Sequence, residues 1–396
     1  MPYATLLRRP HVVRLLTGSL VGRLPTAMAA LAIALTIRQA GGGYTRVGAV
    51  TAGYAIAAAI GGPFLGRAVD RLGQPRVLLG SAFVSAAGFV VLVAAPGDYG
   101  LSILGAVVAG AGTPPLEPCM RALWQSLVKP DELDTAYSLD AGAQELVFIV
   151  GPLVVAGIAA VAPPQAALGA SAGLGLAGAL AMATAKPSRA WTPPPLRAPH
   201  WLGALRSPGL LVLILALAGT GWTVGAFNVF AVAYAERHAI PGGAGSLLAL
   251  SAGGALLGAV CHGKWNTRLW HAPAERKAVV LAIGMTASYA LVALVPGPAL
   301  MSLAALLTGV FFAPLLSVAF GMVAALAPQG TLTEAFAWVV TLIGSGIAAG
   351  SAVGGQLIAA ATLRDCAAVG AAGAGIGAVI LLLGRGSLRV ESLPSS

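Results

Sequence analysis

Residues 66–76 read GRAVDRLGQPR and form a short polar segment. They separate two apolar stretches, 45–67 and 76–95. A helix crosses the hydrocarbon core of a bilayer with about 20 residues, and each stretch is long enough for that. We therefore expect two membrane-spanning helices joined by a tight polar turn.

The residue types in this segment suit a turn between packed helices. Gly66 has no side chain, so it allows a second helix to approach closely. Asp70 and Arg71 can pair with each other or with the ends of helices. Gly73 permits a tight turn, and Arg76 adds a further positive charge. The segment is thus predicted to hold helices together at one membrane surface.

The composition extends this interpretation to the whole chain. Of the 396 residues, 58% are hydrophobic and 9% are charged, whereas a soluble domain is about 25% charged. An ordinary soluble fold is therefore excluded, and we expect an all-α integral membrane protein. Twelve membrane spans are predicted, at 12–37, 45–67, 76–95, 99–123, 134–161, 164–185, 209–235, 244–264, 277–296, 298–325, 332–360 and 363–384.

The basic residues predict how the spans are oriented. Most of the 23 Lys and Arg residues fall between spans on one side, and only Arg38, Arg46, Arg237 and Arg364 fall on the other. By the positive-inside rule, both termini face the cytoplasm. The net charge of +10 is explained by topology, so no nucleic-acid partner is expected. The three cysteines lack the spacing of metal ligands, and no metal site is expected.

An internal repeat divides the chain into two halves. Gly66 recurs as Gly263 at an offset of 197, and further matches follow along the chain at offsets of up to 199. A constant offset indicates a six-helix unit duplicated in the same orientation. We predict an N-terminal half at 1–185, a cytoplasmic linker at 186–207 and a C-terminal half at 208–396.

The 66–76 segment resembles the signature of the loop between spans 2 and 3 in the major facilitator superfamily, and the resemblance covers the whole chain. It implies the superfamily fold of twelve helices in two halves. It also implies that Asp70 and Arg71, with Gly66, Gly73 and Arg76, help to latch a cytoplasmic gate. The second copy has Thr267 where the first has Asp70, so the pattern is not repeated there.

Span 5 contains Gly142 and Gly151-Pro152, which are similar to the glycine-proline motif of the antiporter branch of this superfamily. The resemblance implies a bacterial exporter. Glycine and proline would shape a bend and a close contact near the interface between the halves. Ordinary small-residue helix packing is the alternative interpretation.

Ionisable groups inside the spans are the candidate coupling residues. Arg23, Glu117 and Glu145 have similar predicted depths near the middle of the membrane, so Arg23 could meet Glu145 or Glu117. Asp140 is shallower and nearer Arg121, which stands one helical turn from Glu117 and could pair with it. Charges at this depth are costly and usually functional. Either these pairs only orient helices, or a carboxylate exchanges its arginine partner for a proton or substrate.

The C-terminal half is predicted to contribute neutral groups to the cavity. Glu334 is expected to belong to a local capping box with Thr331 at the start of span 11. The C-terminal half thus has no acid near the middle of the membrane, and we expect its cavity residues to be neutral, such as Trp222, Asn228, Phe311 and Trp338.

These features favour a secondary transporter that exports a small molecule by alternating access in exchange for protons. Import with protons, a membrane-embedded enzyme and a non-transporting sensor are the alternatives. The histidines lie in loops or at helix ends, so no catalytic site is expected. Residues 258–264 only approach a nucleotide-binding loop, because Trp265 replaces the required Ser or Thr. No cofactor is expected.

The chain is expected to act as a monomer in a bacterial inner membrane, with the lipid bilayer, a small apolar or weakly basic substrate and protons as its partners. The N-terminus lacks the pattern of a cleavable signal.

Overall fold

A computed structural model of the chain describes residues 2–192, 202–265 and 272–389. It contains helices and no strands in these ranges. Twelve helical segments there are long and apolar enough to cross a membrane, which confirms the predicted spans. The helices in the first part of the chain are α1 (Pro2–Leu7), α2 (Val12–Gln39), α3 (Tyr44–Leu72), α4 (Gln74–Ala94), α5 (Tyr99–Ala111), α6 (Leu116–Leu127), η1 (Pro130–Glu132), α7 (Leu133–Val161), α8 (Gln165–Ala183) and α9 (Lys186–Ala190).

The second part of the chain repeats this order of long helices. Its helices are η2 (Gly203–Arg206), α10 (Pro208–His238), α11 (Gly243–Trp265), α12 (Ala274–Ala293), α13 (Pro298–Leu326), α14 (Leu332–Ala360), α15 (Leu363–Leu383) and α16 (Arg385–Leu388). Thr267, where the second copy of the 66–76 segment departs from the first, lies outside the described residues.

The fourth span is broken into α5 and α6. Gly112, Thr113, Pro114 and Pro115 separate the two helices. A proline lacks the N–H that continues the helical hydrogen bonds, and it disfavours helical geometry in the residue before it. The two consecutive prolines therefore interrupt the helix in the middle of the span.

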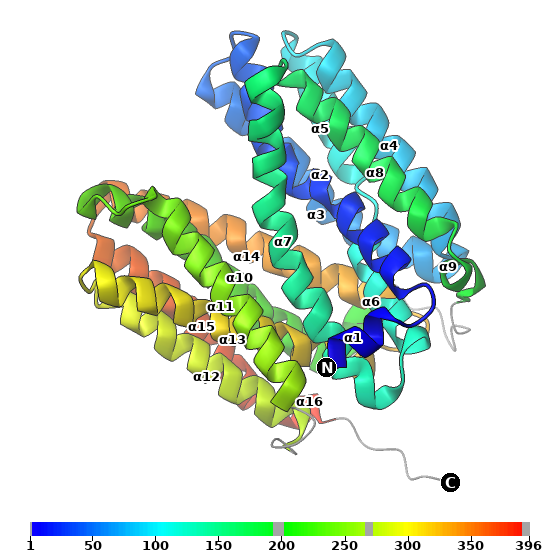
Figure 1. Ribbon diagram of the computed structural model, residues 1–396, viewed down its shortest axis with the longest axis vertical. Helices are drawn as coiled ribbons and strands as arrows, with labels where there is room; N and C mark the ends of the chain where they lie inside the picture. The colour runs from blue at the N-terminus through cyan, green and yellow to red at the C-terminus, as the bar shows by residue number, and fades with distance from the viewer. Residues whose placement is uncertain (1, 193–201, 266–271, 390–396) are drawn as a thin grey trace.

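The long helices form two bundles, α2 to α8 and α10 to α15 (Figure 1). Within the first bundle α2 packs on α8, and within the second α10 packs on α14 and α15. Small residues allow these approaches: a Cβ atom on Gly178 of α8 would collide with the backbone of Gly22 on α2. Close backbone contact of this kind replaces the hydrophobic drive that lipid removes.

The helices α3 and α7 make the main connections between the bundles. The helix α3 packs against α14, and α7 packs against α11 and α13. The bundles converge where α3 ends and where α7 and α14 begin, and they diverge toward the α2–α3 and α10–α11 turns (Figure 1). We call the first region the closed end and the opposite region the open end. The N-terminus and α16 lie at the closed end.

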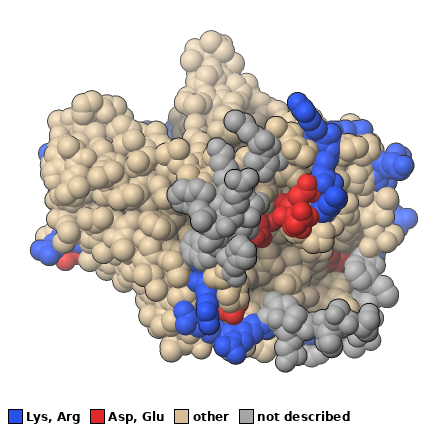
Figure 2. All heavy atoms as spheres, turned by 60° about the horizontal axis from the view of Figure 1, so that its bottom comes forward, with Lys and Arg blue, Asp and Glu red and all other residues tan. Residues whose placement is uncertain are grey.

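Charged residues surround the closed end. Figure 2 brings this end forward and shows lysine, arginine and acidic side chains on it, while the lobes that project away from it are almost free of charge. Exposed hydrophobic side chains cover the sides of the helices, for example Phe83 on α4 and Leu153 on α7. An apolar belt with charged ends is the surface that a bilayer requires.

Candidate substrate cavity and gate

A cavity of about 410 Å³ lies between the two bundles. Its walls come from α2, α3, the break between α5 and α6, and the start of α6, with α14 of the other bundle closing one side. This volume falls in the usual range for small-molecule sites. The break at Gly112 to Pro115 places Thr113, Pro114 and Pro115 in the wall.

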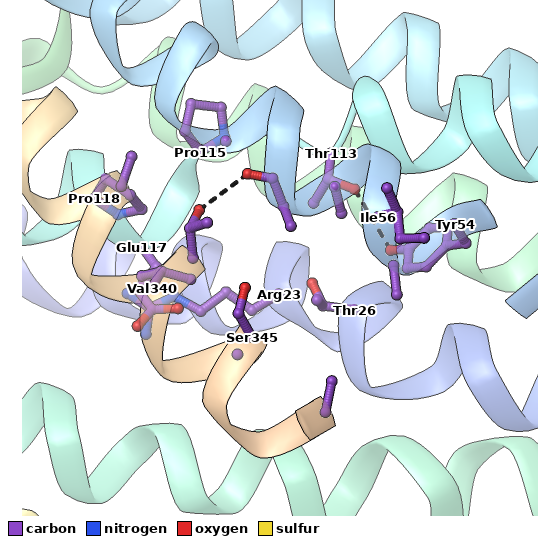
Figure 3. Close-up of a pocket in the computed structure, with 18 of the residues that line it drawn as sticks. Arg23, Thr26, Tyr54, Ile56, Thr113, Pro115, Glu117, Pro118, Val340 and Ser345 are labelled. Carbon is purple, nitrogen blue, oxygen red and sulfur yellow. Dashed lines mark hydrogen bonds between the residues drawn. The ribbon is translucent and has the colours of Figure 1, made fainter. Parts of the chain in front are cut away.

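Most of the cavity wall is apolar, and few polar groups reach it. Figure 3 shows Arg23 and Glu117 near each other, with Val340 and Ser345 of α14 beside them. The hydroxyl groups of Tyr54 and Thr113 lie 3.5 Å apart elsewhere in the wall. Such a site suits a largely apolar ligand that carries one or two polar groups.

Behind the cavity, Asp140 joins two arginines. Its side chain is fully buried and accepts hydrogen bonds from Arg23 Nη2 at 3.0 Å and Arg121 Nε at 2.8 Å. Arg121 Nη2 also pairs with Glu117 at 2.5 Å, and Arg23 Nη1 donates to Gln144 at 2.9 Å. Two positive and two negative groups thus balance one another. We call Arg23, Glu117, Arg121 and Asp140 the charge cluster.

Arg121 pairs with Glu117, as its spacing allowed, and with Asp140, which the sequence placed near it. Depth alone would let Arg23 meet Glu145 or Glu117, but Arg23 pairs with Asp140 instead. Asp140 and Gln144 are four residues apart and so share one face of α7. That face points at α2, and both side chains bond Arg23. Glu145 follows Gln144 by one residue, which turns it away from Arg23 by about 100°.

The charge cluster also touches the second bundle. The guanidinium carbon of Arg121 lies 3.6 Å from the centre of the Phe320 ring on α13. A cation over an aromatic face is attracted to it, by about 2 kcal/mol when both are desolvated. Arg121 therefore connects the charge cluster of one bundle to the other.

At the closed end, Asp70 caps a helix of the opposite bundle. Its carboxylate accepts the backbone N–H of Thr333 at 3.1 Å and of Glu334 at 2.8 Å, in the first turn of α14. A carboxylate in this position satisfies free N–H groups and interacts favourably with the helix dipole. The capping box predicted for Thr331 and Glu334 is therefore wrong, because Thr331 makes no side-chain cap.

Glu334 pairs instead with an arginine of the first bundle. Arg67 Nη2 lies 2.5 Å from Glu334 Oε1, and the Glu334 side chain is only 2% exposed. Arg67 was not singled out as a functional residue by the sequence, although it stands next to Gly66. Together, Asp70 and Arg67 hold the end of α3 against the start of α14.

The other residues of the 66–76 segment have different surroundings. A Cβ atom on Gly66 would collide with Glu334 and Ala337, so the close approach of α3 to α14 needs glycine. Gly73 has a φ angle of 84°, which allows the turn into α4. Arg71 and Arg76 are exposed and form no ion pair with the described residues.

The comparison with known families decides the class of protein. A sequence profile of the Major Facilitator Superfamily matches residues 15–298. The chain belongs to this superfamily. It is a multi-pass membrane protein and a secondary transporter that works by alternating access on a small-molecule substrate, not an enzyme.

Solved structures of the superfamily share the fold over nearly the whole chain. A bacterial homologue of the iron transporter ferroportin, in an outward-facing state, superposes with a TM-score of 0.73 at 15% identity, covering 94% of this chain and 99% of its own. The human organic anion transporter MFSD10 (TETRAN) gives 0.69 at 15% identity, with 94% and 100% covered. The Escherichia coli fucose:proton symporter FucP gives 0.69 at 15%, with 95% and 99% covered. No curated protein matches by sequence.

The glycine-proline residues of α7 serve two contacts in this superfamily fold. Gly142 faces the other bundle, where a Cβ atom on it would meet Ala259 and Leu256 of α11 at 3.5 and 3.6 Å. Gly151 packs against α2 within its own bundle, and Pro152 is exposed inside α7. Only Gly142 thus lies at the contact between the halves.

Trp222 and Asn228 do not line the described cavity. Trp222 Nε1 donates to the Val369 carbonyl at 3.0 Å and so links α10 to α15. Asn228 is half-buried on α10. The second bundle instead contributes Thr341 and Ser345 of α14, whose place in the cavity no sequence motif marks.

Proposed function

We propose that this transporter exports a small, largely apolar or weakly basic molecule in exchange for protons. The observation that carries the proposal is the apolar cavity between the bundles, in which Glu117 supplies the negative charge and belongs to a balanced charge cluster. A basic group of the substrate can replace Arg121 as the partner of Glu117. Arg121 then keeps Asp140 and the Phe320 ring as partners.

Two features support export as the direction. The Gly142 and Gly151-Pro152 pattern resembles the antiporter branch, and Gly142 lies at the contact between the bundles. The basic residues support a cytoplasmic closed end, since the positive-inside rule places Lys and Arg there. In that orientation the cavity opens outward, in the state that would release an exported molecule and take up a proton.

We also propose that residues 1–185 and 208–396 move as two halves joined by the linker 186–207. The monomer would act in a bacterial inner membrane.

A flux assay in proteoliposomes tests this function, with ethidium as an apolar cationic probe. We expect an imposed pH gradient to drive ethidium against its concentration gradient, and a protonophore to abolish the effect. Ethidium and protons moving in the same direction would instead indicate import by symport. Equal flux with and without the pH gradient would contradict proton coupling.

A further inference from the structure

The helix α7 carries two carboxyl groups in its interior with opposite surroundings. Asp140 is fully buried and bound by two arginines. Glu145, five residues later, is half-buried and forms no hydrogen bond or ion pair with the described residues. It stands about 18 Å from the start of α7 at 1.5 Å per residue, close to the middle of the membrane.

Glu145 lies on the side of α7 that meets the second bundle. Gly142, one turn before it, packs against Leu256 and Ala259 of α11. Glu145 interacts electrostatically with Tyr289 of α12, which is 4% exposed. The Tyr289 hydroxyl interacts in turn with Thr308, whose hydroxyl lies 3.0 Å from that of Ser251. The neutral hydroxyl group of Tyr289 in the second bundle is therefore within electrostatic range of Glu145.

No cation among the described residues compensates Glu145. On α2, Arg23 is bound by Asp140 and Gln144. On α11, His262 interacts with Asp134 at the beginning of α7, about 16 Å from Glu145 along the helix. The helices α8 and α13 have no titratable residue. On α1, Tyr3 donates a hydrogen bond to the Ala259 carbonyl. On α6, Glu117 and Arg121 pair with each other in the charge cluster.

From this placement we infer that Glu145 is the group that binds and releases the coupled proton, whereas Asp140 is a positioning residue for Arg23 and Arg121. The inference rests on the proposed proton coupling and names its site. An ionised carboxylate without a cation is unfavourable at this depth, while the neutral acid is tolerated. Proton exchange at Asp140 would instead leave two buried guanidinium groups without their partner.

The position of Glu145 explains how one proton could be passed between the two sides. In the structure, the Gly142 contact lies between Glu145 and the closed end. A proton binds the carboxylate from the open end and gives the neutral acid, so the bundles rearrange without moving an unpaired charge. When α7 and α11 part at the closed end, the acid becomes accessible from that side and releases the proton, which restores the carboxylate.

An infrared titration of the full chain in lipid tests this assignment without a substrate. Spectra recorded from acidic to alkaline buffer report the carbonyl band of protonated carboxyl groups. We expect the difference between wild type and Glu145→Gln to contain one titrating band. Glu145→Asp should keep such a band with a shifted midpoint. The matched controls Glu117→Gln and the exposed surface variant Glu236→Gln should leave the band of Glu145 unchanged.

Loss of this band in Glu117→Gln but not in Glu145→Gln would overturn the inference. The absence of a titrating band from the difference between wild type and Glu145→Gln would overturn it as well. Elution as a single species on gel filtration checks that each variant is folded, and the Glu145→Asp midpoint provides the test if Glu145→Gln does not fold. If the band is assigned to Glu145 but ethidium flux ignores the pH gradient, Glu145 still binds and releases a proton, and the proposed proton coupling fails.

Discussion

The two contacts between the bundles are equivalent by the internal repeat, yet their chemistry differs. Where α3 meets α14, Asp70 caps the opposite helix and Arg67 pairs with Glu334. Where α11 and α13 meet α7, the described contacts include small neutral groups: Ser138 and Ser317 share a hydrogen bond of 2.8 Å, and Gly142 packs against α11. At the beginning of α7, Asp134 interacts with His262 of α11. The repeat thus preserves the backbone arrangement, while Asp70, Arg67 and Glu334 give the α3–α14 contact an ionic character that Ser138, Ser317 and Gly142 do not share.

This difference indicates distinct roles for the two contacts. An ionic contact with capped N–H groups has discrete bound and separated states, because partial separation leaves buried polar groups without partners. A contact of small neutral residues has no such penalty and allows helices to slide. We interpret the α3–α14 contact as the lock of the closed end and the α7–α11 contact as the place where the helices move past Glu145.

The largest effect on stability is expected at Asp140 of α7, which binds Arg23 and Arg121 inside the first bundle. Asp140→Asn leaves Arg23 and Arg121 buried without their carboxylate, and breaking a buried pair from one side costs about 3–5 kcal/mol. Thermal unfolding in detergent should show a strongly lowered midpoint. Glu117→Gln is the matched control with a smaller expected loss, since its side chain is 17% exposed. Equal losses for the two variants would contradict the central position of Asp140.

The next largest effect is expected at the lock. Asp70→Ala removes the cap of α14, which is worth about 0.5–2 kcal/mol. Because about 1.4 kcal/mol is a tenfold change in an equilibrium constant, the population with a separated closed end should rise several-fold. Distances between spin labels at the exposed residues Ser126 and Ser387 report this separation. An unchanged distance distribution would show that the cap does not hold the bundles together.

Two arginines of the same segment provide a sharper comparison. Arg67→Gln breaks the ion pair with the buried Glu334, which should cost about 1–3 kcal/mol of contact energy at the closed end. The population with a separated closed end should therefore rise here too. Arg71→Gln should change stability by no more than about 0.5 kcal/mol, since Arg71 is exposed and forms no ion pair with the described residues. The same spin-label pair measures both variants. A larger effect at Arg71 would reverse our assignment of the lock residues.

A small effect is also expected beside the α7–α11 contact, where α1 meets α11. Tyr3→Phe removes the hydrogen bond from the Tyr3 hydroxyl to the Ala259 carbonyl, 2.7 Å long, at a cost of about 1 kcal/mol. Burial raises the pKa of Tyr3 from 10.0 to about 12, and the nearby Cys261 adds to this shift. The neutral phenol is the stabilising form, so the contribution is complete below pH 10.0 and is lost as pH rises through about 12.

Thermal unfolding of Tyr3→Phe and wild type at several pH values measures this contribution. The difference between the two should be the same at neutral and mildly alkaline pH. A difference that already falls near neutral pH would contradict the role of the hydroxyl as a donor.

Local sequence patterns predicted the spans well, because each span needs only its own apolar residues and flanking breakers. They failed where a partner comes from far along the chain. Thr331 and Glu334 have the spacing of a capping box, but Asp70, which is 264 residues from Glu334, supplies the cap. No local pattern can reveal a cap from another bundle.

The sequence identifies the four residues of the charge cluster, but it does not predict all of the pairs that they form. Depth along the helices placed Arg23, Glu117 and Glu145 at similar levels, but depth does not fix direction around a helix. Gln144 was the available signal, since it shares a face with Asp140 and so could have indicated that this face of α7, not that of Glu145, meets Arg23.

The most direct test of the account is whether proton movement depends on the carboxyl groups of the first bundle. Proteoliposomes with a pH-sensitive dye inside would report proton flux driven by an ethidium gradient, for wild type, Glu117→Gln/Glu145→Gln and the surface control Glu236→Gln. We expect proton flux in wild type and control, and none in the double variant. Proton flux in the double variant equal to that of wild type would contradict a role of these carboxyl groups in proton movement.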